Sequence, residues 1–236
     1  MQKKQNNSWE IAQFWHIGQR GSNQDSILVR QMKKGKRICS LLVVCDGIGG
    51  LQEGEKASGH IVYQLSSWFV QKGCKSKSLR QGKRQMKRLL YQIHRQLQNY
   101  GRIQNIQMGS TICFVFMIGR RYFWGQVGDS RIYRIQKKKC KCLSRDQIHA
   151  NGALLYAIGV GDWKIPKCKY GKLHKNEALL LCTDGFYRGL SEEQILQFLN
   201  SANSEAPLQR RLDQLGQKKL SMGEQDNLSA LLVALH

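Results

Sequence analysis

Residues 41–50, L-L-V-V-C-D-G-I-G-G, join five apolar residues to an aspartate that a glycine follows directly. A short apolar run bounded by turn residues is typical of a buried strand. Four more aspartates lie beside predicted strands and next to small or polar residues: Asp25 in R-G-S-N-Q-D, Asp129 in V-G-D-S-R, Asp184 in C-T-D-G-F and Asp226 in Q-D-N. Only 16 of 236 residues are acidic, so five carboxylates in this setting indicate a common site.

Carboxylates that cluster where buried strands end need cations to neutralise their charge. Oxygen ligands, with no Cys or His at metal-ligand spacing beside them, favour hard ions such as Mg²⁺ or Mn²⁺ over zinc. A lone Asp-Gly pair, such as Asp46-Gly47 or Asp184-Gly185, is more often a turn than a metal ligand. The joint occurrence of all five aspartate motifs, in the order of a known protein family, favours a metal site over separate turns.

In their order along the chain, these motifs resemble those of the PPM family of metal-dependent serine/threonine protein phosphatases, the protein phosphatase 2C type. The resemblance runs from about residue 18 to residue 233 and includes G-E-K-A-S at residues 54–58 and G-S-T at residues 109–111. It implies an α+β fold, a four-layer α-β-β-α sandwich of two antiparallel sheets flanked by helices. It also implies a metal site at one edge, between the sheets.

The resemblance assigns metal-binding roles to five positions. Asp46 is expected to bridge two ions, and the Gly47 carbonyl to complete one of the two sites. Asp184 and Asp226 are expected to hold the other ion. Asp25 is expected to act through metal-bound waters. The implied cofactor is therefore Mn²⁺ or Mg²⁺, two ions in all, with a position for a third.

Other positions complete the implied site. Asp129, together with Asp184, matches the position that binds a third, weaker metal in bacterial-type members. Arg20 matches the arginine that binds the substrate phosphate, and a planar guanidinium suits bidentate contact with phosphoryl oxygens. Asn227 is expected to orient the preceding aspartate or a metal-bound water. The predicted catalytic residues are Arg20, Asp46 and Asp184.

Four motif residues are expected to support the site rather than to perform chemistry. Ser58 is expected to fix the first helix near the site, and Thr111 to form a hydrogen bond at its edge. Arg131 is predicted to pair near Asp129. Arg188 is expected to form a surface ion pair, with contact to the substrate as the alternative.

The chain departs from the family pattern in two places. Ile48 occupies a position where animal members have a histidine thought to protonate the leaving alkoxide, and isoleucine has no proton to give. Residues 148–156 are too few for the mobile flap that many bacterial-type members carry here. We therefore expect a more open site that discriminates weakly between local substrate sequences.

The resemblance predicts hydrolysis of phosphoserine and phosphothreonine on proteins by a metal-activated water, without a phosphoenzyme intermediate. The expected substrates are phosphoproteins modified by a cognate Ser/Thr kinase, and the expected state is a monomer. Two alternatives remain open at this point. One is a catalytically weak, phosphoprotein-binding pseudo-phosphatase, and the other is a basic nucleic-acid-binding protein with vestigial motifs.

Composition predicts one domain over residues 1–236, because 41% of residues are apolar and no Pro-rich or Ser-rich linker divides the chain. We expect a cytoplasmic protein with no membrane span, in which the eight cysteines are structural thiols rather than zinc ligands. The formal charge of +22 would attract polyanions. Many of the basic residues lie in predicted turns and on wet helix faces, which favours solvated surfaces over a nucleic-acid groove.

Apolar periodicity predicts two helices between groups of strands, and two more before a final strand. The predicted strands cover residues 9–17, 26–32, 38–45, 179–182 and 228–235, with several more between residues 110 and 143. The predicted helices cover residues 52–70, 83–100, 192–200 and 207–215.

Overall fold

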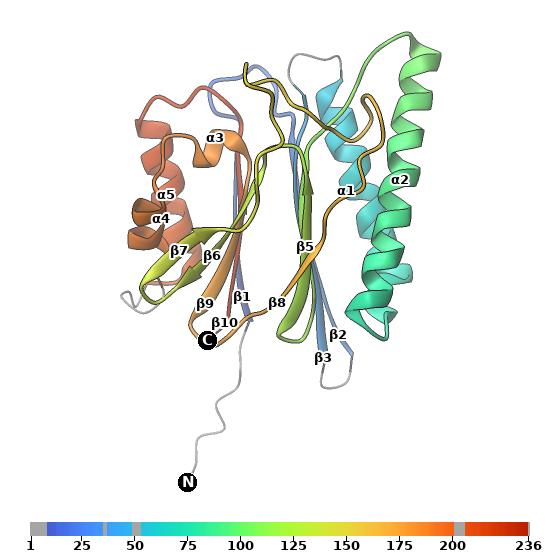
Figure 1. The fold of residues 1–236 in the computed structure, drawn as a ribbon. Helices are drawn as coiled ribbons and strands as arrows, with labels where there is room; N and C mark the ends of the chain where they lie inside the picture. Colours follow the sequence, from blue (N-terminus) through green and yellow to red (C-terminus); the bar gives the residue numbers. More distant parts are fainter. Residues whose placement is uncertain (1–8, 35–36, 49–52, 201–205, 236) are drawn as a thin grey trace.

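The structure, a computed structural model, describes residues 9–34, 37–48, 53–200 and 206–235. In this part of the chain, two five-stranded sheets pack face to face, and helices cover the outer face of each (Figure 1). Neighbouring strands are antiparallel throughout both sheets. The predicted four-layer α-β-β-α sandwich is therefore confirmed.

The first sheet joins the two ends of the chain, because its first strand pairs with its last. In spatial order it contains β1 (Trp9–His16), β10 (Leu228–Leu235), β9 (Glu177–Cys182), β6 (Arg131–Gln136) and β7 (Lys139–Cys142). The second sheet contains β2 (Asp25–Lys34), β3 (Arg37–Asp46), β4 (Ile112–Ile118), β5 (Arg121–Val127) and β8 (Lys169–Lys172).

Helices of very different length cover the two sheets. The second sheet is covered by α1 (Gly54–Gln71) and α2 (Leu79–Gln104), which the short 3₁₀ turn η1 (Gly73–Lys75) connects. The first sheet is covered by α3 (Asp184–Tyr187), α4 (Glu192–Leu199) and α5 (Leu208–Ser221). In α2, buried residues recur at helical spacing on one face: Met86, Leu90, Ile93 and Leu97.

The central core lies between the two sheets. Leu42, Val44 and Val115 from the second sheet meet Leu181 and Val233 from the first, and all five are fully buried. Burying each such side chain away from water contributes about 1.5–3 kcal/mol to the stability of the fold. Both sheets are apolar on both faces, which explains why their central strands are continuous apolar runs instead of alternating patterns.

Most predicted elements are confirmed within a few residues, and the differences concern short or polar segments. The second helix begins earlier than predicted, at Leu79, because Ser78 caps it by accepting a hydrogen bond from the Gln81 backbone N–H. Three elements were not predicted: η1, β8 and α3. The predicted turn around Gly35 and the predicted start of the first helix at Gln52 lie outside the described residues.

Among the described residues, no helix is both long enough and apolar enough to cross a membrane.

Candidate active site

Asp25 and Asp46 face each other at the same end of the second sheet. Asp25 begins β2 and Asp46 ends β3, and the strand register places them directly opposite each other. Side chains at opposed positions of antiparallel strands have Cβ atoms about 4.5–5.5 Å apart. Two like charges at that distance repel each other, so this pair is stable only with cations or protons nearby.

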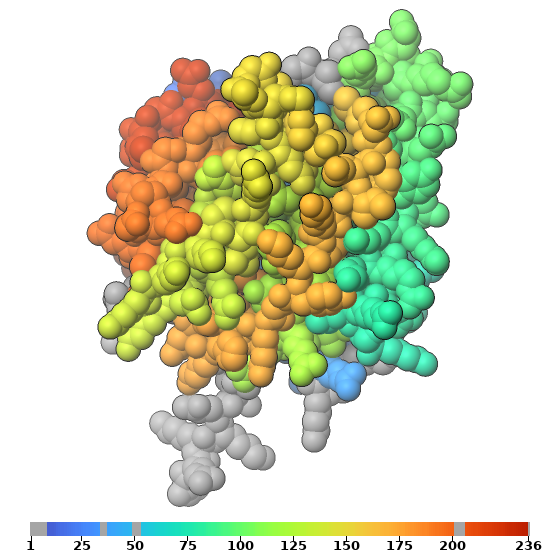
Figure 2. Space-filling view, viewed as in Figure 1, coloured from blue at the N-terminus to red at the C-terminus, as the bar shows by residue number. Residues whose placement is uncertain are grey.

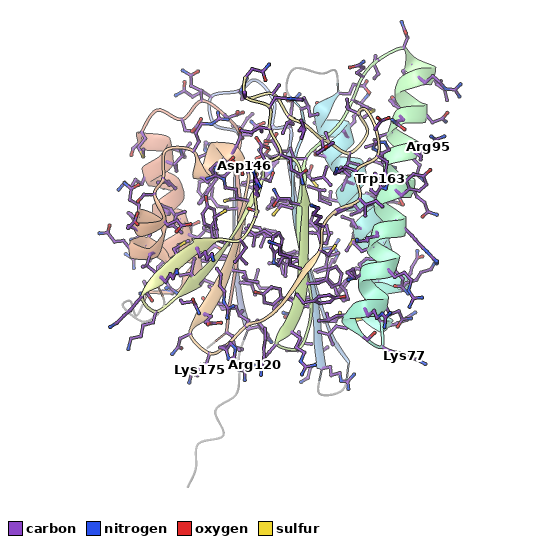
Figure 3. The ribbon with its side chains drawn as sticks, in the orientation of Figure 1. Lys77, Arg95, Arg120, Asp146, Trp163 and Lys175 are labelled. Atoms are coloured by element: carbon purple, nitrogen blue, oxygen red, sulfur yellow. The ribbon has the colours of Figure 1, made fainter. Side chains whose placement is uncertain are left out.

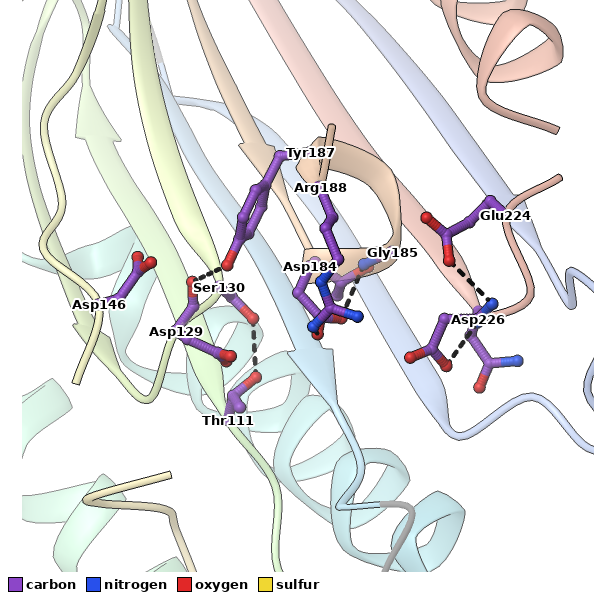
Figure 4. Close-up of polar contacts among 12 residues, drawn as sticks. Thr111, Asp129, Ser130, Asp146, Asp184, Gly185, Tyr187, Arg188, Glu224 and Asp226 are labelled. Atoms are coloured by element: carbon purple, nitrogen blue, oxygen red, sulfur yellow. Dashed lines mark hydrogen bonds and ion pairs between the residues drawn. The ribbon is translucent and has the colours of Figure 1, made fainter. Parts of the chain in front are cut away.

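The other three aspartates reach this end from the first sheet and from the turn between the sheets. Asp129 follows Gly128, whose φ of +101° in the β5–β6 turn favours glycine. Asp184 is the first residue of α3, and only Thr183 separates it from β9. Asp226 precedes β10, and a Cβ at Gly185 would lie 3.1 Å from the Asp226 Cβ. Figure 4 shows Asp129, Asp184 and Asp226 side by side at this edge.

Burial and repulsion by neighbouring charges raise the pKa values of Asp25, Asp46 and Asp129. Burial, followed by the charges of the neighbouring aspartates, holds the pKa of Asp46 well above its usual range. Burial raises the pKa of Asp25 to about 7, although a hydrogen bond from Thr183 opposes the shift. Burial and the charge of Asp184 raise the pKa of Asp129 to about 6. Each shift shows that the site disfavours uncompensated negative charge.

The donor atoms at this edge are carboxylate oxygens, the chemical type that hard divalent cations prefer. Among the described residues, no group of three or more His, Cys, Asp and Glu side chains is arranged to hold a metal ion by itself. A cation here would therefore need water to complete its coordination, and Mg²⁺ commonly keeps several waters.

Gly47, the residue after Asp46, packs closely on the start of α1. A Cβ at this position would lie 2.4 Å from the Gly54 carbonyl oxygen.

Two arginines pair with predicted metal ligands. Arg20 Nε donates to Asp226 Oδ1 at 3.1 Å, and the arginine side chain is 56% exposed. Arg188 Nη2 donates to Asp184 Oδ2 at 2.5 Å, and its side chain is 62% exposed (Figure 4). The ion pair predicted for Arg188 is thus present, but its partner is a site carboxylate. Both guanidinium groups are more than half exposed beside site carboxylates.

Buried hydroxyl groups fix the backbone around the aspartates. Thr111 Oγ1 accepts from the Asp46 backbone N–H at 3.1 Å and lies 2.8 Å from Ser130 Oγ. Thr183 Oγ1 donates to Asp25 Oδ2 at 2.9 Å. Ser58 Oγ on α1 donates to the Gln24 carbonyl at 2.6 Å. The supporting roles predicted for Thr111 and Ser58 agree with these contacts.

Asn227 contacts the preceding aspartate and also the loop after β1. Its backbone N–H donates to Asp226 Oδ1 at 2.9 Å, but its side chain faces the loop after β1. There Oδ1 accepts from Gln24 N at 2.8 Å, while Nδ2 donates to the carbonyls of Ile17 and Ser22. The amide therefore anchors the loop that carries Arg20, which belongs to no helix or strand.

Arg131 was predicted to pair near Asp129, and it does so through Asp146, whose charge acts on the Asp129 carboxyl group. Its guanidinium makes a bidentate ion pair with Asp146, through Nε at 3.0 Å and Nη2 at 2.7 Å. It also lies 3.8 Å above the ring of Tyr187. The hydroxyl of Tyr187 donates to the Asp129 backbone carbonyl at 3.3 Å, so Arg131 acts on this turn through Tyr187.

Lys219 is a buried residue that supports the site and was not predicted from the sequence. Its ammonium on α5 donates to the Arg188 carbonyl and, at 2.9 Å, to Glu224 Oε2. The other oxygen of Glu224 accepts from the backbone N–H groups of Gln225 and Asp226. The Lys219 side chain is 3% exposed. One lysine in a strongly basic chain carries no sequence signal, yet here it connects the segments that carry Asp184 and Asp226.

The segment between β7 and β8 contains no helix and only isolated bridges, one of them between Ile148 and Leu154. Figure 2 shows it, yellow to orange, spread over the front of the molecule where Figure 1 shows the two sheets meeting. A second bridge joins Ile158 to Ser110. The absence of a full-length flap stays a prediction.

Comparison with known proteins supports the resemblance. The family model for protein phosphatase 2C matches residues 14–232. A serine/threonine phosphatase of Listeria welshimeri is 25% identical over 235 residues, which cover 91% of this chain and 90% of the relative.

Solved structures show the same fold. A serine/threonine phosphatase of Staphylococcus aureus superposes with a TM-score of 0.87 at 22% identity, covering 100% of this chain and 98% of that one. The catalytic domain of a serine/threonine protein phosphatase in complex with two manganese ions gives 0.79 at 20% identity, covering 96% and 98%. The family match includes every predicted site residue and nearly the whole chain, and the chain therefore belongs to the protein phosphatase 2C family.

Proposed function

We propose that this protein removes phosphate from phosphoserine and phosphothreonine in proteins, with Mn²⁺ or Mg²⁺ as the cofactor. The observation that carries the proposal is the convergence of five aspartates, from both sheets, on one edge of the sandwich. Membership of a protein phosphatase family supports the reaction, and the name of the Listeria relative supports the choice of serine and threonine.

The metal ligands that we propose are those implied by the family resemblance. Asp46, the Gly47 carbonyl, Asp184 and Asp226 would hold two ions, and Asp25 would act through water. A bound pair of divalent cations supplies positive charge to the phosphoryl oxygens and makes hydroxide available near neutral pH. The raised pKa values at Asp25 and Asp46 support these roles, because such carboxylates gain most from a neighbouring cation.

Side chains of this protein would position the substrate. Arg20 is more than half exposed and would move from Asp226 to the phosphate, which its planar guanidinium can contact with two hydrogen bonds. Asp129 and Asp184 would provide the position for a third ion. Ile48 cannot donate a proton, so the leaving serine or threonine oxygen would take its proton from water.

We propose direct transfer of the phosphoryl group to water, without a phosphoenzyme. Water forms the new bond to phosphorus while the bond to the serine or threonine oxygen breaks. The thiols give no competing nucleophile near the site, because Cys45 and Cys182 are fully buried and burial raises the pKa of each well above its usual range. These thiols therefore stay protonated at neutral pH.

We also propose one catalytic domain over residues 1–236, since β1 and β10 pair in one sheet and the family match extends from the end of β1 into β10. The expected substrates are phosphoproteins modified by a Ser/Thr kinase. A monomeric state and a cytoplasmic location remain predictions, which light scattering and cell fractionation would test.

The decisive experiment measures hydrolysis of a phosphothreonine peptide with and without Mn²⁺, in wild type and in Asp46→Asn. We expect activity only with the metal, and a loss of more than about a hundredfold in the variant, since outer partners of a metal ligand already contribute 10–100-fold. Asp162→Asn is the matched control, because Asp162 is an exposed carboxylate outside the site. It should keep wild-type activity.

Calorimetric titration with Mn²⁺ provides a second readout that does not depend on turnover. Weaker Mn²⁺ binding by Asp46→Asn than by Asp162→Asn would support the proposed ligand. A folded wild type that binds the phosphopeptide but hydrolyses it with neither Mn²⁺ nor Mg²⁺ would replace the proposal with the pseudo-phosphatase alternative.

A further inference from the structure

A concave pocket of about 840 Å³ lies among the basic residues at the end of the sandwich opposite the aspartates. Figure 3 labels Lys77 and Arg120 at this end, and Asp146 near the other. The residues that line this pocket include no acid. They include six bases, namely Arg37, Lys77, Arg80, Arg120, Arg121 and Lys172. We call this site the basic pocket.

Strand direction separates the basic pocket from the aspartates. β3 begins with Arg37 and ends with Asp46, and β5 begins with Arg121 and ends just before the turn that carries Asp129. A strand rises about 3.3 Å per residue, so ten residues of β3 span roughly 30 Å. A small ligand in the basic pocket would therefore not touch the site carboxylates.

The cations of the basic pocket have no compensating carboxylate. The ion pairs of the described residues involve other bases, and none includes a lining residue of this pocket. Like charges that share a concavity repel one another, and an anion would relieve that repulsion. The 26-residue helix α2 also begins here, and its N-terminus adds partial positive charge.

Two lining side chains are already positioned. Arg120 is half-buried, and its Nε donates to the Leu173 carbonyl at 3.2 Å, which restricts the guanidinium. Tyr170 is 50% exposed, and its ring lies 4.5 Å from Nζ of Lys83, a further cation beside the pocket. Because these contacts already restrict the Arg120 guanidinium and the Tyr170 ring, the two side chains lose less conformational entropy on ligand binding than unrestrained lysines do.

We infer that the basic pocket binds a compact anion that carries two or more phosphate groups. Its volume lies within the range of about 300–1,000 Å³ that small-molecule sites occupy. Arginine side chains match phosphate oxygens with paired hydrogen bonds. The cations come from four separate segments that surround one hollow, whereas a nucleic-acid duplex would need cations along an extended track.

The test uses inorganic tripolyphosphate as the probe, titrated calorimetrically into protein freed of divalent ions, at about 0.15 M salt where long-range attraction is screened. One variant carries Arg80→Ser, Arg121→Ser and Lys172→Ser. The matched control carries Lys137→Ser, Lys138→Ser and Lys139→Ser, which removes three exposed charges from the β6–β7 turn and the first residue of β7.

We expect saturable binding by the wild type and a Kd at least about tenfold weaker in the pocket variant, because charge-assisted hydrogen bonds are lost. The control should bind within about twofold of the wild type, since long-range charge is screened. Arg121→Ser alone should weaken binding about threefold, and it keeps the test usable if the triple variant does not fold.

Equal loss in the pocket variant and the control would overturn the inference, because general surface charge would then explain binding. Absence of saturable binding would also overturn it. A DNA duplex that bound more tightly than tripolyphosphate and depended on the same three residues would identify nucleic acid as the occupant instead. Because no metal is present, each outcome is independent of whether the protein is a phosphatase.

Discussion

At one end of the strands, five carboxylates lie among hydrogen bonds that fix their backbone, whereas at the other end six cations surround an open hollow. The difference extends to the glycines. A Cβ at Gly47 would lie 2.4 Å from a backbone oxygen, while one at Gly119 would meet nothing within 4 Å. The end proposed for catalysis is therefore tightly packed at Gly47, whereas the end proposed for anion binding is open at Gly119.

Of the changes considered for the two ends of the molecule, removing the Lys219 ammonium at the aspartate end should have the largest effect. Lys219→Met breaks a buried ion pair and should lower the free energy of unfolding by about 3 kcal/mol. It should also weaken Mn²⁺ binding about tenfold, because Glu224 then positions the Asp226 backbone less firmly. Chemical denaturation and calorimetric Mn²⁺ titration measure the two effects.

The control is Lys218→Met, which removes the same charge from the preceding residue, whose ammonium lies 5.1 Å from the Phe198 ring instead of at the site. It should leave Mn²⁺ affinity unchanged. If Lys219→Met lost stability but bound Mn²⁺ as the wild type does, Lys219 would only stabilise the fold.

The paired substitutions Gly47→Ala and Gly119→Ala test how tightly each end is packed. Gly47→Ala should cost about 2–3 kcal/mol, because the new methyl group would collide with the Gly54 backbone. Gly119→Ala should cost only about 1 kcal/mol, the penalty for an L-residue at its φ of +55°. Thermal or urea unfolding compares them, and equal costs would contradict the proposed difference in packing.

The pH dependence of stability should give the most gradual effect, about 1.4 kcal/mol per pH unit for each proton that the folded state retains. The raised pKa values, about 7 for Asp25 and about 6 for Asp129, mean that the folded metal-free protein keeps protons that the unfolded chain has released. Its free energy of unfolding should therefore fall as pH rises from about 4 to 7. Urea denaturation at several pH values measures this slope.

The slope should become shallower in Asp25→Asn, because one of the titrating groups is gone. It should be unchanged in the triple variant of the basic pocket, since Lys and Arg do not titrate in this range. A slope that depended on the basic pocket and not on Asp25 would show that the aspartates are not its source.

The strands and the five aspartates could be predicted because each signal is local. An apolar run followed by Asp-Gly identifies a strand and its end, and the family order then places the ends together. The edge strand β8, K-Y-G-K, was missed because it is polar and mostly exposed. Helix α3 was missed because four residues are too few for helical periodicity.

Contacts between distant segments could not be predicted in the same way. The partner of Arg131, the anchoring role of the Asn227 side chain and the burial of Lys219 all depend on where loops meet. The basic pocket is a further example, because its six cations come from four stretches of a chain in which basic residues are common.

The strands place cations at one end of the molecule and carboxylates at the other, so its charge distribution is asymmetric along the strand direction. On a negatively charged support, such as a cation-exchange resin, the chain should settle with Arg37, Arg121 and Lys172 against the surface. The aspartates would then face the liquid. Simple adsorption should accordingly immobilise the protein with its active site uncovered, and salt should release it.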